Sequence, residues 1–365
     1  MISAKNYAVE FWRFLFTLLV VMGHLEISTV LAGETFGRGG MSVEFFFILS
    51  GFLLFQGYQK AWNKENSILG FTINLIRKRV VRFAPIYYIC FLMGALYHIY
   101  LYSMYTDKTA MDILSFEKGL WPELVFLNSI VFHADSANSS TWFISALLIG
   151  TLLLVLMLSS ADKAGVKPWI ILTAVFIVCF YFHFFTGIEA SLSRITRALY
   201  GLSLGGICYL FTYKLHEEEM YVPKKGLMTL FEIICISGII YCLFLYKGNS
   251  EIRIPLLLFC SGLIISSFLQ KSIVSKFLNR KIFAFLGSIS YAIYVSHLQV
   301  LTKFGWLPGF NLLENKVYSY VVILTTVIGW GVFINYLPLI IKKAFKWLYG
   351  LVHAEDTLKY IRYGK

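Results

Sequence analysis

The chain has few charged residues and few prolines. Only 14% of its 365 residues are Asp, Glu, Lys or Arg, whereas 58% are hydrophobic, and the mean hydropathy is +0.71. A soluble domain carries roughly 25% charged residues, so this chain cannot cover a water-exposed surface with charge. The shortage of charge excludes a soluble protein and indicates that lipid is the main solvent.

The sequence also lacks the spacings that metal sites and disulfide frameworks require. It contains no Cys-x-x-Cys or His-x-x-x-His pattern, so no metal site is predicted. All six cysteines fall within apolar runs rather than in loops, which favours small packing residues over disulfides: Cys90, Cys179, Cys208, Cys235, Cys242 and Cys260. The net charge of +12 lies in short loops between apolar runs and forms no basic patch, so we expect membrane lipid as a partner and no nucleic acid.

Apolar runs long enough to cross a bilayer, about 20 residues each, predict an all-α polytopic membrane protein with about ten transmembrane helices. Lys and Arg collect in alternate loops, which places both termini in the cytoplasm. We expect a transmembrane domain over residues 1–341 and a basic amphipathic cytoplasmic tail over 342–365 that lies on the inner leaflet. Within the longest outer loop, residues 120–133 are too short to span and favour an interfacial or re-entrant helix. The predicted spans are 8–31, 40–58, 81–102, 141–158, 168–186, 194–213, 227–246, 253–270, 283–303 and 317–341.

The first span contains two ionisable residues, Arg13 and His24. They are eleven residues apart, which is about three turns and roughly 16 Å along one helical face. Ionisable groups inside a bilayer are costly and therefore mark functional sites by default. An arginine can anchor the phosphates of a thioester donor, and a histidine can take a proton from an attacking hydroxyl. An arginine that reaches the interface and a histidine bonded to a neighbouring helix would explain the pair equally well. If the pair is functional, both side chains should line one cavity.

Several motifs resemble those of the membrane acyltransferase-3 family, in order and over almost the whole chain. Each motif alone is weak, but the first three together are specific. They are Phe11-Trp12-Arg13 followed by His24, then Gly40-Met41-Ser42-Val43-Glu44-Phe45-Phe46 with Ser50-Gly51-Phe52, then Arg79-Val80-Val81-Arg82 with Pro85, and later Thr141-Trp142-Phe143 and Gly287-Ser288-Ile289-Ser290-Tyr291 up to His297.

The resemblance implies an enzyme that transfers an acyl group, most simply acetyl, from a cytoplasmic acyl-CoA to a hydroxyl of a cell-surface glycan or lipid-linked sugar. His24 is then the catalytic base, and Arg13, Arg79 and Arg82 bind the donor. Acyl-CoA is a substrate, and no permanently bound cofactor is expected. The protein belongs in the cell membrane as a multi-pass protein.

Other residues fit this reading less directly. Glu44 lies at about the depth of His24 and either orients it or pairs with Arg38. Arg197 needs a partner, either Glu44 or Glu189. Trp142, Tyr291 and His297 are candidates for substrate binding.

A secondary transporter or exporter of a polysaccharide or small-molecule precursor is the alternative function, because many spans with intramembrane charges also describe carriers. Carriers often show inverted repeats and paired helices broken by Gly or Pro. The seven prolines form no such two-fold pattern, which favours the enzyme.

Overall fold

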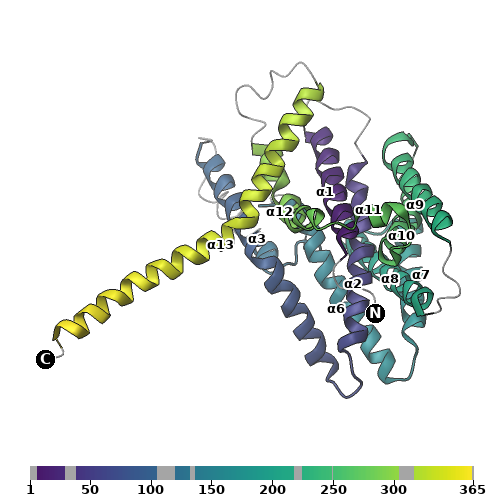
Figure 1. The fold of residues 1–365 in the computed structure, drawn as a ribbon, viewed down its shortest axis with the longest axis horizontal. Helices are drawn as coiled ribbons and strands as arrows, with labels where there is room; N and C mark the ends of the chain where they lie inside the picture. The colour runs from purple at the N-terminus through teal and green to yellow at the C-terminus, as the bar shows by residue number, and fades with distance from the viewer. Residues whose placement is uncertain are drawn as a thin grey trace.

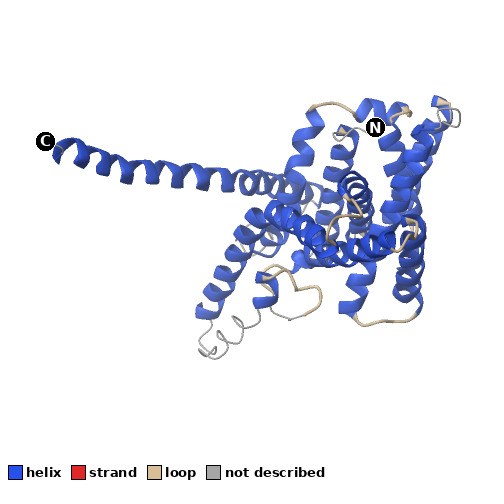
Figure 2. Cartoon of the chain, turned by 90° about the horizontal axis from the view of Figure 1, so that it is seen from below, coloured by secondary structure: helices blue, strands red, loops and turns tan. Residues whose placement is uncertain are grey.

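The computed structural model describes residues 6–28, 38–104, 120–131, 136–217, 224–248, 250–303 and 316–363. Within these ranges most residues are helical, short loops join the helices, and there is no strand (Figure 2). The predicted all-α class is confirmed.

Ten long helices build the described part of the protein, and each corresponds to one predicted span. They are α1 (Tyr7–Ser28), α2 (Val43–Ala61), α3 (Ile68–Met104), α6 (Trp142–Lys163), α7 (Pro168–Phe185), α8 (Ala190–Glu217), α9 (Lys225–Ile240, extended by a π-helical turn, Tyr241–Leu245), α10 (Arg253–Leu269), α12 (Ile282–Lys303) and α13 (Lys316–Tyr363).

Eight helical segments of the described chain are long and apolar enough to cross a membrane. The other two long helices are α8, which has 28 residues and carries Arg194 and Arg197, and α10, which has only 17 residues. Both helices pack against α2, and they also pack against each other. The protein is therefore a multi-pass membrane protein, and the side on which its termini lie stays a prediction.

Short helices complete the described chain: η1 (Gly39–Ser42), α5 (Trp121–Leu124), η2 (Ser139–Thr141), η5 (Ser250–Ile252) and α11 (Ile273–Leu278). The predicted interfacial or re-entrant segment 120–133 contains α5, and residues 132 and 133 lie outside the described part. Hydroxyls of Tyr87 and Tyr88 on α3 donate to the carbonyls of Glu123 and Leu124. The segment therefore docks against the middle of α3, and its helix α5 has only four residues.

Glycines allow α2 and α8 to approach closely. A Cβ added at Gly51 would lie 2.1 Å from the carbonyl oxygen of Leu202, and one at Gly205 would lie 2.0 Å from that of Ile48. Small residues at such contacts are typical of helix pairs in membranes. The α2–α8 pair forms the centre of the bundle.

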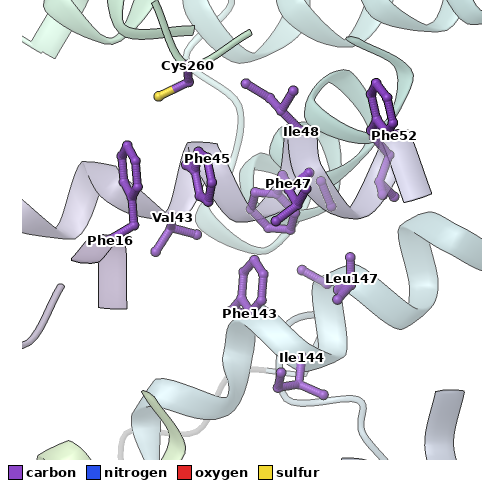
Figure 3. Packing of buried hydrophobic residues seen from close by; sticks show 14 of the residues in the cluster. Phe16, Val43, Phe45, Phe47, Ile48, Phe52, Phe143, Ile144, Leu147 and Cys260 are labelled. Carbon is purple, nitrogen blue, oxygen red and sulfur yellow. The ribbon is translucent and has the colours of Figure 1, made fainter. Parts of the chain in front are cut away.

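Phenylalanines of α2 fill the space between α6 and α10. The ring of Phe16 on α1 stacks on Phe45 with centroids 4.0 Å apart, and Phe47 packs against Phe143 at 4.6 Å. Figure 3 shows these side chains between Leu147 and Cys260. This packing fixes α2 relative to α1 and α6, the helices that carry candidate site residues.

Two neighbouring helices flank α12: α1 on one side and α13 on the other (Figure 1). α13 continues beyond Pro338 to Tyr363 and projects away from the bundle toward the C-terminus. The predicted tail is thus helical up to residue 363 and continuous with the last span. Its position on the inner leaflet stays a prediction.

Candidate active site

A cavity of about 480 Å³ lies among α1, α2, α3, α6, α12 and α13. It brings together Arg13 of α1 with Arg79 and Arg82 of α3, which the sequence predicted to share one ligand. The remaining lining residues are Thr17, Phe46, Leu49, Ser50, Leu53, Phe83, Ile86, Phe143, Ile144, Leu147, Gly287, Ser288, Ser290, Tyr291, Tyr294 and Asn335.

The cavity has two chemically different ends. The arginine end contains Arg13, Arg79 and Arg82, and the serines of α12 lie beside it. The aromatic end contains Phe46, Phe143 and Tyr294. Tyr294 lies seven residues beyond Gly287 on α12, about two turns or roughly 10 Å along the helix axis. The long axis of the cavity therefore follows α12, with the arginine end at one extreme and the aromatic end at the other.

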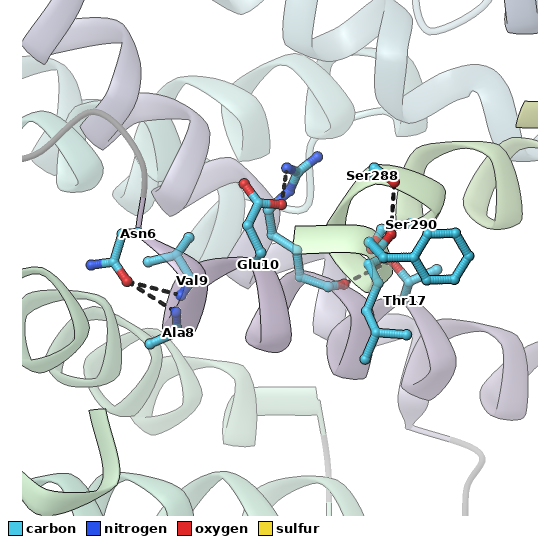
Figure 4. A network of polar contacts seen from close by, with 10 residues as sticks. Asn6, Ala8, Val9, Glu10, Thr17, Ser288 and Ser290 are labelled. Atoms are coloured by element: carbon cyan, nitrogen blue, oxygen red, sulfur yellow. Dashed lines mark hydrogen bonds and ion pairs between the residues drawn. The ribbon is translucent and has the colours of Figure 1, made fainter. Parts of the chain in front are cut away.

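Glu10 holds Arg13 at the arginine end. A nitrogen of the guanidinium, Nη1, donates to Oε2 of Glu10 at 2.7 Å, one turn away on α1 (Figure 4). Gly287 of α12 makes room for this carboxylate, because a Cβ there would lie 1.8 Å from the same oxygen. Glu10 neutralises one of three cationic charges, so the lining keeps an excess of positive charge.

Arg79 is bound by a neutral hydroxyl rather than by a carboxylate. Its Nη1 donates to the hydroxyl of Thr151 on α6 at 3.1 Å. No described salt bridge involves Arg79 or Arg82. Arg79 and Arg82 are three residues apart, so they share one face of α3 and can grip one anion together.

The rings of His24 and His297 lie together one turn beyond the aromatic end. Nδ1 of His24 is 2.9 Å from the Val20 carbonyl oxygen and 3.3 Å from Nε2 of His297. Nδ1 of His297 is 2.6 Å from the carbonyl oxygen of Tyr294. A carbonyl oxygen can only accept a hydrogen bond, so the ring nitrogen that faces it must carry a proton. We therefore assign the proton of each ring to Nδ1. Nε2 of His297 then accepts from His24, and Nε2 is the basic nitrogen of His24.

The structure separates this histidine pair from the cavity. Neither His24 nor His297 is among the lining residues, so the prediction that Arg13 and His24 line one cavity is wrong. Val20 and Val21 are fully buried and fill the turn between Thr17 and His24. The ring of Tyr294 lies between the cavity and His297, with centroids 5.9 Å apart.

One family accounts for the order of these features along the chain. The sequence model of the acyltransferase-3 family, described as an acyltransferase domain, matches residues 6–337. The chain belongs to the acyltransferase-3 family. No curated protein and no solved structure matched it. The protein is thus a membrane acyltransferase, and the match includes every candidate site residue.

Glu44 of this acyltransferase is fully buried and bound to arginines. Nε of Arg197 donates to its Oε1 at 2.7 Å, the Tyr200 hydroxyl donates to the same oxygen at 3.0 Å, and Nε of Arg253 is 3.4 Å away. The expected Glu44–Arg197 pair is confirmed. The geometry gives no support to Glu44 as the group that orients His24, because its partners come from α8 and α10; Arg38 instead donates to the Gly248 carbonyl.

The other predicted substrate-binding residues lie apart from one another. Tyr291 lines the cavity, and its hydroxyl donates to the Phe83 carbonyl at 3.0 Å. Trp142 lies outside the cavity lining, and the guanidinium carbon of Arg197 is 5.5 Å from its ring centroid. His297 is fully buried against His24. Its ring contacts His24 of α1 and does not line the cavity.

Sequence reasoning missed two features of the acyltransferase site. The pairing of His24 with His297 joins residues 273 positions apart, and only their similar depth in two spans could have indicated it. The position of Tyr294 between the histidines and the cavity left no signal beyond its place one turn before His297. Thr151 and Asn335 also reach the cavity region, and neither belongs to a motif recognised in the sequence.

Proposed function

We propose that this acyltransferase moves an acyl group, most simply acetyl, from a cytoplasmic acyl-CoA to a hydroxyl of a cell-surface glycan or lipid-linked sugar. The observation that carries the proposal is the arrangement along α1 and α12. Three arginines lie at one end of a lengthwise cavity, and a histidine whose basic nitrogen is Nε2 lies one turn beyond the other end. Such an arrangement suits a long donor with an anionic head and a reactive thioester at its far end.

The arginine end supports binding of the phosphate groups of the donor. Arg79 and Arg82 point into one space with Arg13, and only Arg13 has a described carboxylate partner. Charge-assisted bonds from arginine to phosphate are stronger than neutral hydrogen bonds and can be bidentate. Excess positive charge in a partly enclosed space favours a polyanionic ligand over a neutral one.

The apolar part of the cavity supports binding of the rest of the donor. Leu49, Ile86, Ile144 and Leu147 face it together with the aromatic end. These walls offer little to a charged group but can pack against a pantetheine arm and a short acyl chain. A donor whose phosphates bind at Arg79 and Arg82 would therefore direct its thioester toward Tyr294 and the histidine pair.

His24 has the geometry of a general base. Nε2 of its ring takes the proton of the acceptor hydroxyl as the hydroxyl oxygen attacks the thioester carbonyl carbon. A carbon–oxygen bond forms, the carbon–sulfur bond breaks, and the CoA thiolate leaves and takes a proton. His297 fixes the ring of His24 by accepting from Nδ1–H, as second partners of catalytic histidines do. General-base catalysis of this kind contributes roughly 10²–10⁴-fold in rate.

The acceptor approaches His24 from outside the cavity. His24 is partly exposed although it does not line the cavity. Trp142, whose ring lies 5.7 Å and 5.5 Å from the guanidinium carbons of Arg194 and Arg197, offers an aromatic face, which is a common platform for a sugar ring. We place the enzyme in the cell membrane, with the donor on the cytoplasmic side.

Comparison of cells with and without the gene tests the proposal. Surface glycans and lipid-linked sugars from both are analysed by mass spectrometry. The proposal predicts one acyl increment, about 42 mass units for acetyl as the composition C₂H₂O requires, that is present only with the gene and is removed by mild base. Identical glycan and lipid-linked sugar spectra would contradict the assigned acceptor class.

A further inference from the structure

We propose that Tyr294 is a movable barrier between the donor cavity and the His24–His297 pair, and that it decides between acyl transfer and hydrolysis. The acyl group of the donor and the acceptor hydroxyl meet only when this ring moves aside. While the ring is in place, it keeps water on the histidine side away from the thioester. The role in transfer rests on the proposed function, whereas the barrier itself rests on geometry alone.

The position of Tyr294 is the first support. It is the one residue of the described chain that both lines the cavity and has a ring contact with His297. The backbone reinforces this link, because the Tyr294 carbonyl accepts from Nδ1 of His297. The Tyr294 ring therefore lies in direct contact with the histidine pair.

Three mutually contacting rings close the aromatic end. The Tyr294 ring lies 5.4 Å from Phe143 of α6 and 6.2 Å from Phe46 of α2, and these two phenylalanines are 6.2 Å apart. Tyr294 is only 6% exposed. A cluster of three aromatic side chains from three helices leaves no polar path through its centre.

The tether of Tyr294 is compatible with movement. Its hydroxyl donates to the Ser140 carbonyl at 3.2 Å, which is long for an O–H···O bond. Ser140 belongs to the short η2 segment rather than to a long helix. By contrast, Phe143 and Phe46 are apolar and packed within helices. Rotation of Tyr294 therefore breaks one long hydrogen bond and no salt bridge.

The barrier would protect the donor thioester from hydrolysis. An open connection would let water reach the thioester beside His24. Water would then attack the carbonyl carbon, His24 would take its proton, the carbon–sulfur bond would break, and a free acid and CoA thiol would result. Exclusion of water prevents such side reactions. A ring that opens only with the acceptor in place would suppress this loss of donor.

Thiol labelling tests the barrier without any enzyme activity. His24→Cys is introduced into the full chain, and a charged, membrane-impermeant thiol reagent is added to vesicles of either orientation. The six native cysteines are buried, and the parent chain measures their background. If the ring is open for about 10% of the time or less, permanent removal by Tyr294→Ala should raise the labelling rate from the arginine face at least about tenfold.

Matched variants separate the barrier from general loosening. Tyr294→Phe keeps the ring but loses its hydrogen bond to Ser140, and it should label more slowly than Tyr294→Ala. Tyr291→Ala removes another ring from the same cavity wall and should also label slowly. Tyr294→Leu replaces the Ala variant if that variant fails to insert, and it should still label faster than Tyr294→Phe. Equal labelling of the introduced thiol with Tyr294 intact or removed, or equally fast labelling with Tyr291→Ala, would overturn the proposal.

Release of free CoA from acetyl-CoA by purified protein, without acceptor, tests the catalytic consequence. Tyr294→Ala should release CoA faster than the wild type under these conditions, and Tyr294→Phe should not. Acceptor-independent release by Tyr294→Ala that is no faster than wild-type release would overturn the link to hydrolysis. Failure of the proposed function looks different: the wild type would then release no CoA even with acceptor, while the labelling result would stand.

Discussion

Nε2 of His297 lies 3.3 Å from Nδ1 of His24, across the contact between α12 and α1. The same Nδ1 is 2.9 Å from the Val20 carbonyl oxygen, so its proton faces two acceptors, and the opposite nitrogen, Nε2, is the basic one. His297 is fully buried and bonded to the backbone of its own helix, so its ring cannot turn freely. One buried histidine thus orients another that is partly exposed.

Replacement of His297 by Leu should therefore lower kcat by roughly 10–100-fold, the range seen when a partner that orients a catalytic histidine is lost. The KM for acyl-CoA should stay near the wild-type value, because His297 does not line the cavity. His297→Gln keeps a group that can accept from His24 and should recover part of kcat. Steady-state kinetics of CoA release measure both parameters. A rise in donor KM with kcat unchanged would indicate a different role.

Replacement of Arg79 or Arg82 by Gln should weaken donor binding. Loss of a charge-assisted phosphate contact costs about 1.5–3 kcal/mol, or about ten- to a hundredfold in affinity. Arg77→Gln is the matched control, because Arg77 is an exposed residue on the same helix and does not line the cavity. Calorimetric titration with CoA in detergent gives the affinities. Equal affinities for all three variants would assign the arginines to membrane topology alone.

Gly205→Ala should destabilise the bundle. The new methyl group would overlap the carbonyl oxygen of Ile48, 2.0 Å away, and must separate α2 from α8. Overpacking of this kind costs about 1–3 kcal/mol or more. Gly57→Ala on α2 meets nothing within 4 Å and should be neutral or stabilising by up to about 1 kcal/mol. Thermal unfolding in detergent compares the two. A lower melting temperature for Gly57→Ala than for Gly205→Ala would refute the close α2–α8 contact.

Glu44→Gln should also destabilise the fold, through charge rather than volume. It leaves Arg197 and Arg253 without the carboxylate that binds both. Removal of one member of a buried ion pair costs about 3–5 kcal/mol. The double variant Glu44→Gln/Arg197→Gln removes one of the two arginine charges left behind and should regain part of the loss in thermal unfolding. If the double variant is less stable than Glu44→Gln, the Glu44–Arg197 pair is not the source of the effect.

The helices of this protein could be predicted from sequence because lipid allows few alternatives. Backbone groups in a bilayer must bond within their own helix, so each long apolar run had to form one. The same solvent predicted that Arg197 needs an anion, with Glu44 and Glu189 as the alternatives, and the structure selects Glu44. Arg13, Arg79 and Arg82 could be grouped because local motifs contain them.

The inside of the site could not be predicted in the same way. Helical periodicity places Arg13 and His24 on one face of α1, but it cannot show that Tyr294, far along the chain on α12, closes the space between them. Periodicity also cannot choose between Glu44 and His297 as the neighbour of His24. Both lie at a suitable depth, and only the packing of α12 against α1 and of α8 against α2 decides.

The most direct test of the account is the rate of CoA release from acetyl-CoA by purified wild-type protein and by His24→Ala, with a preparation of the cell's own surface glycans and lipid-linked sugars as acceptor. Size-exclusion profiles and melting temperatures confirm that both proteins are folded. The account predicts release by the wild type and a loss of roughly 10²–10⁴-fold in kcat for His24→Ala, with CoA affinity unchanged because His24 does not line the cavity. Release by folded His24→Ala at the wild-type rate would contradict it.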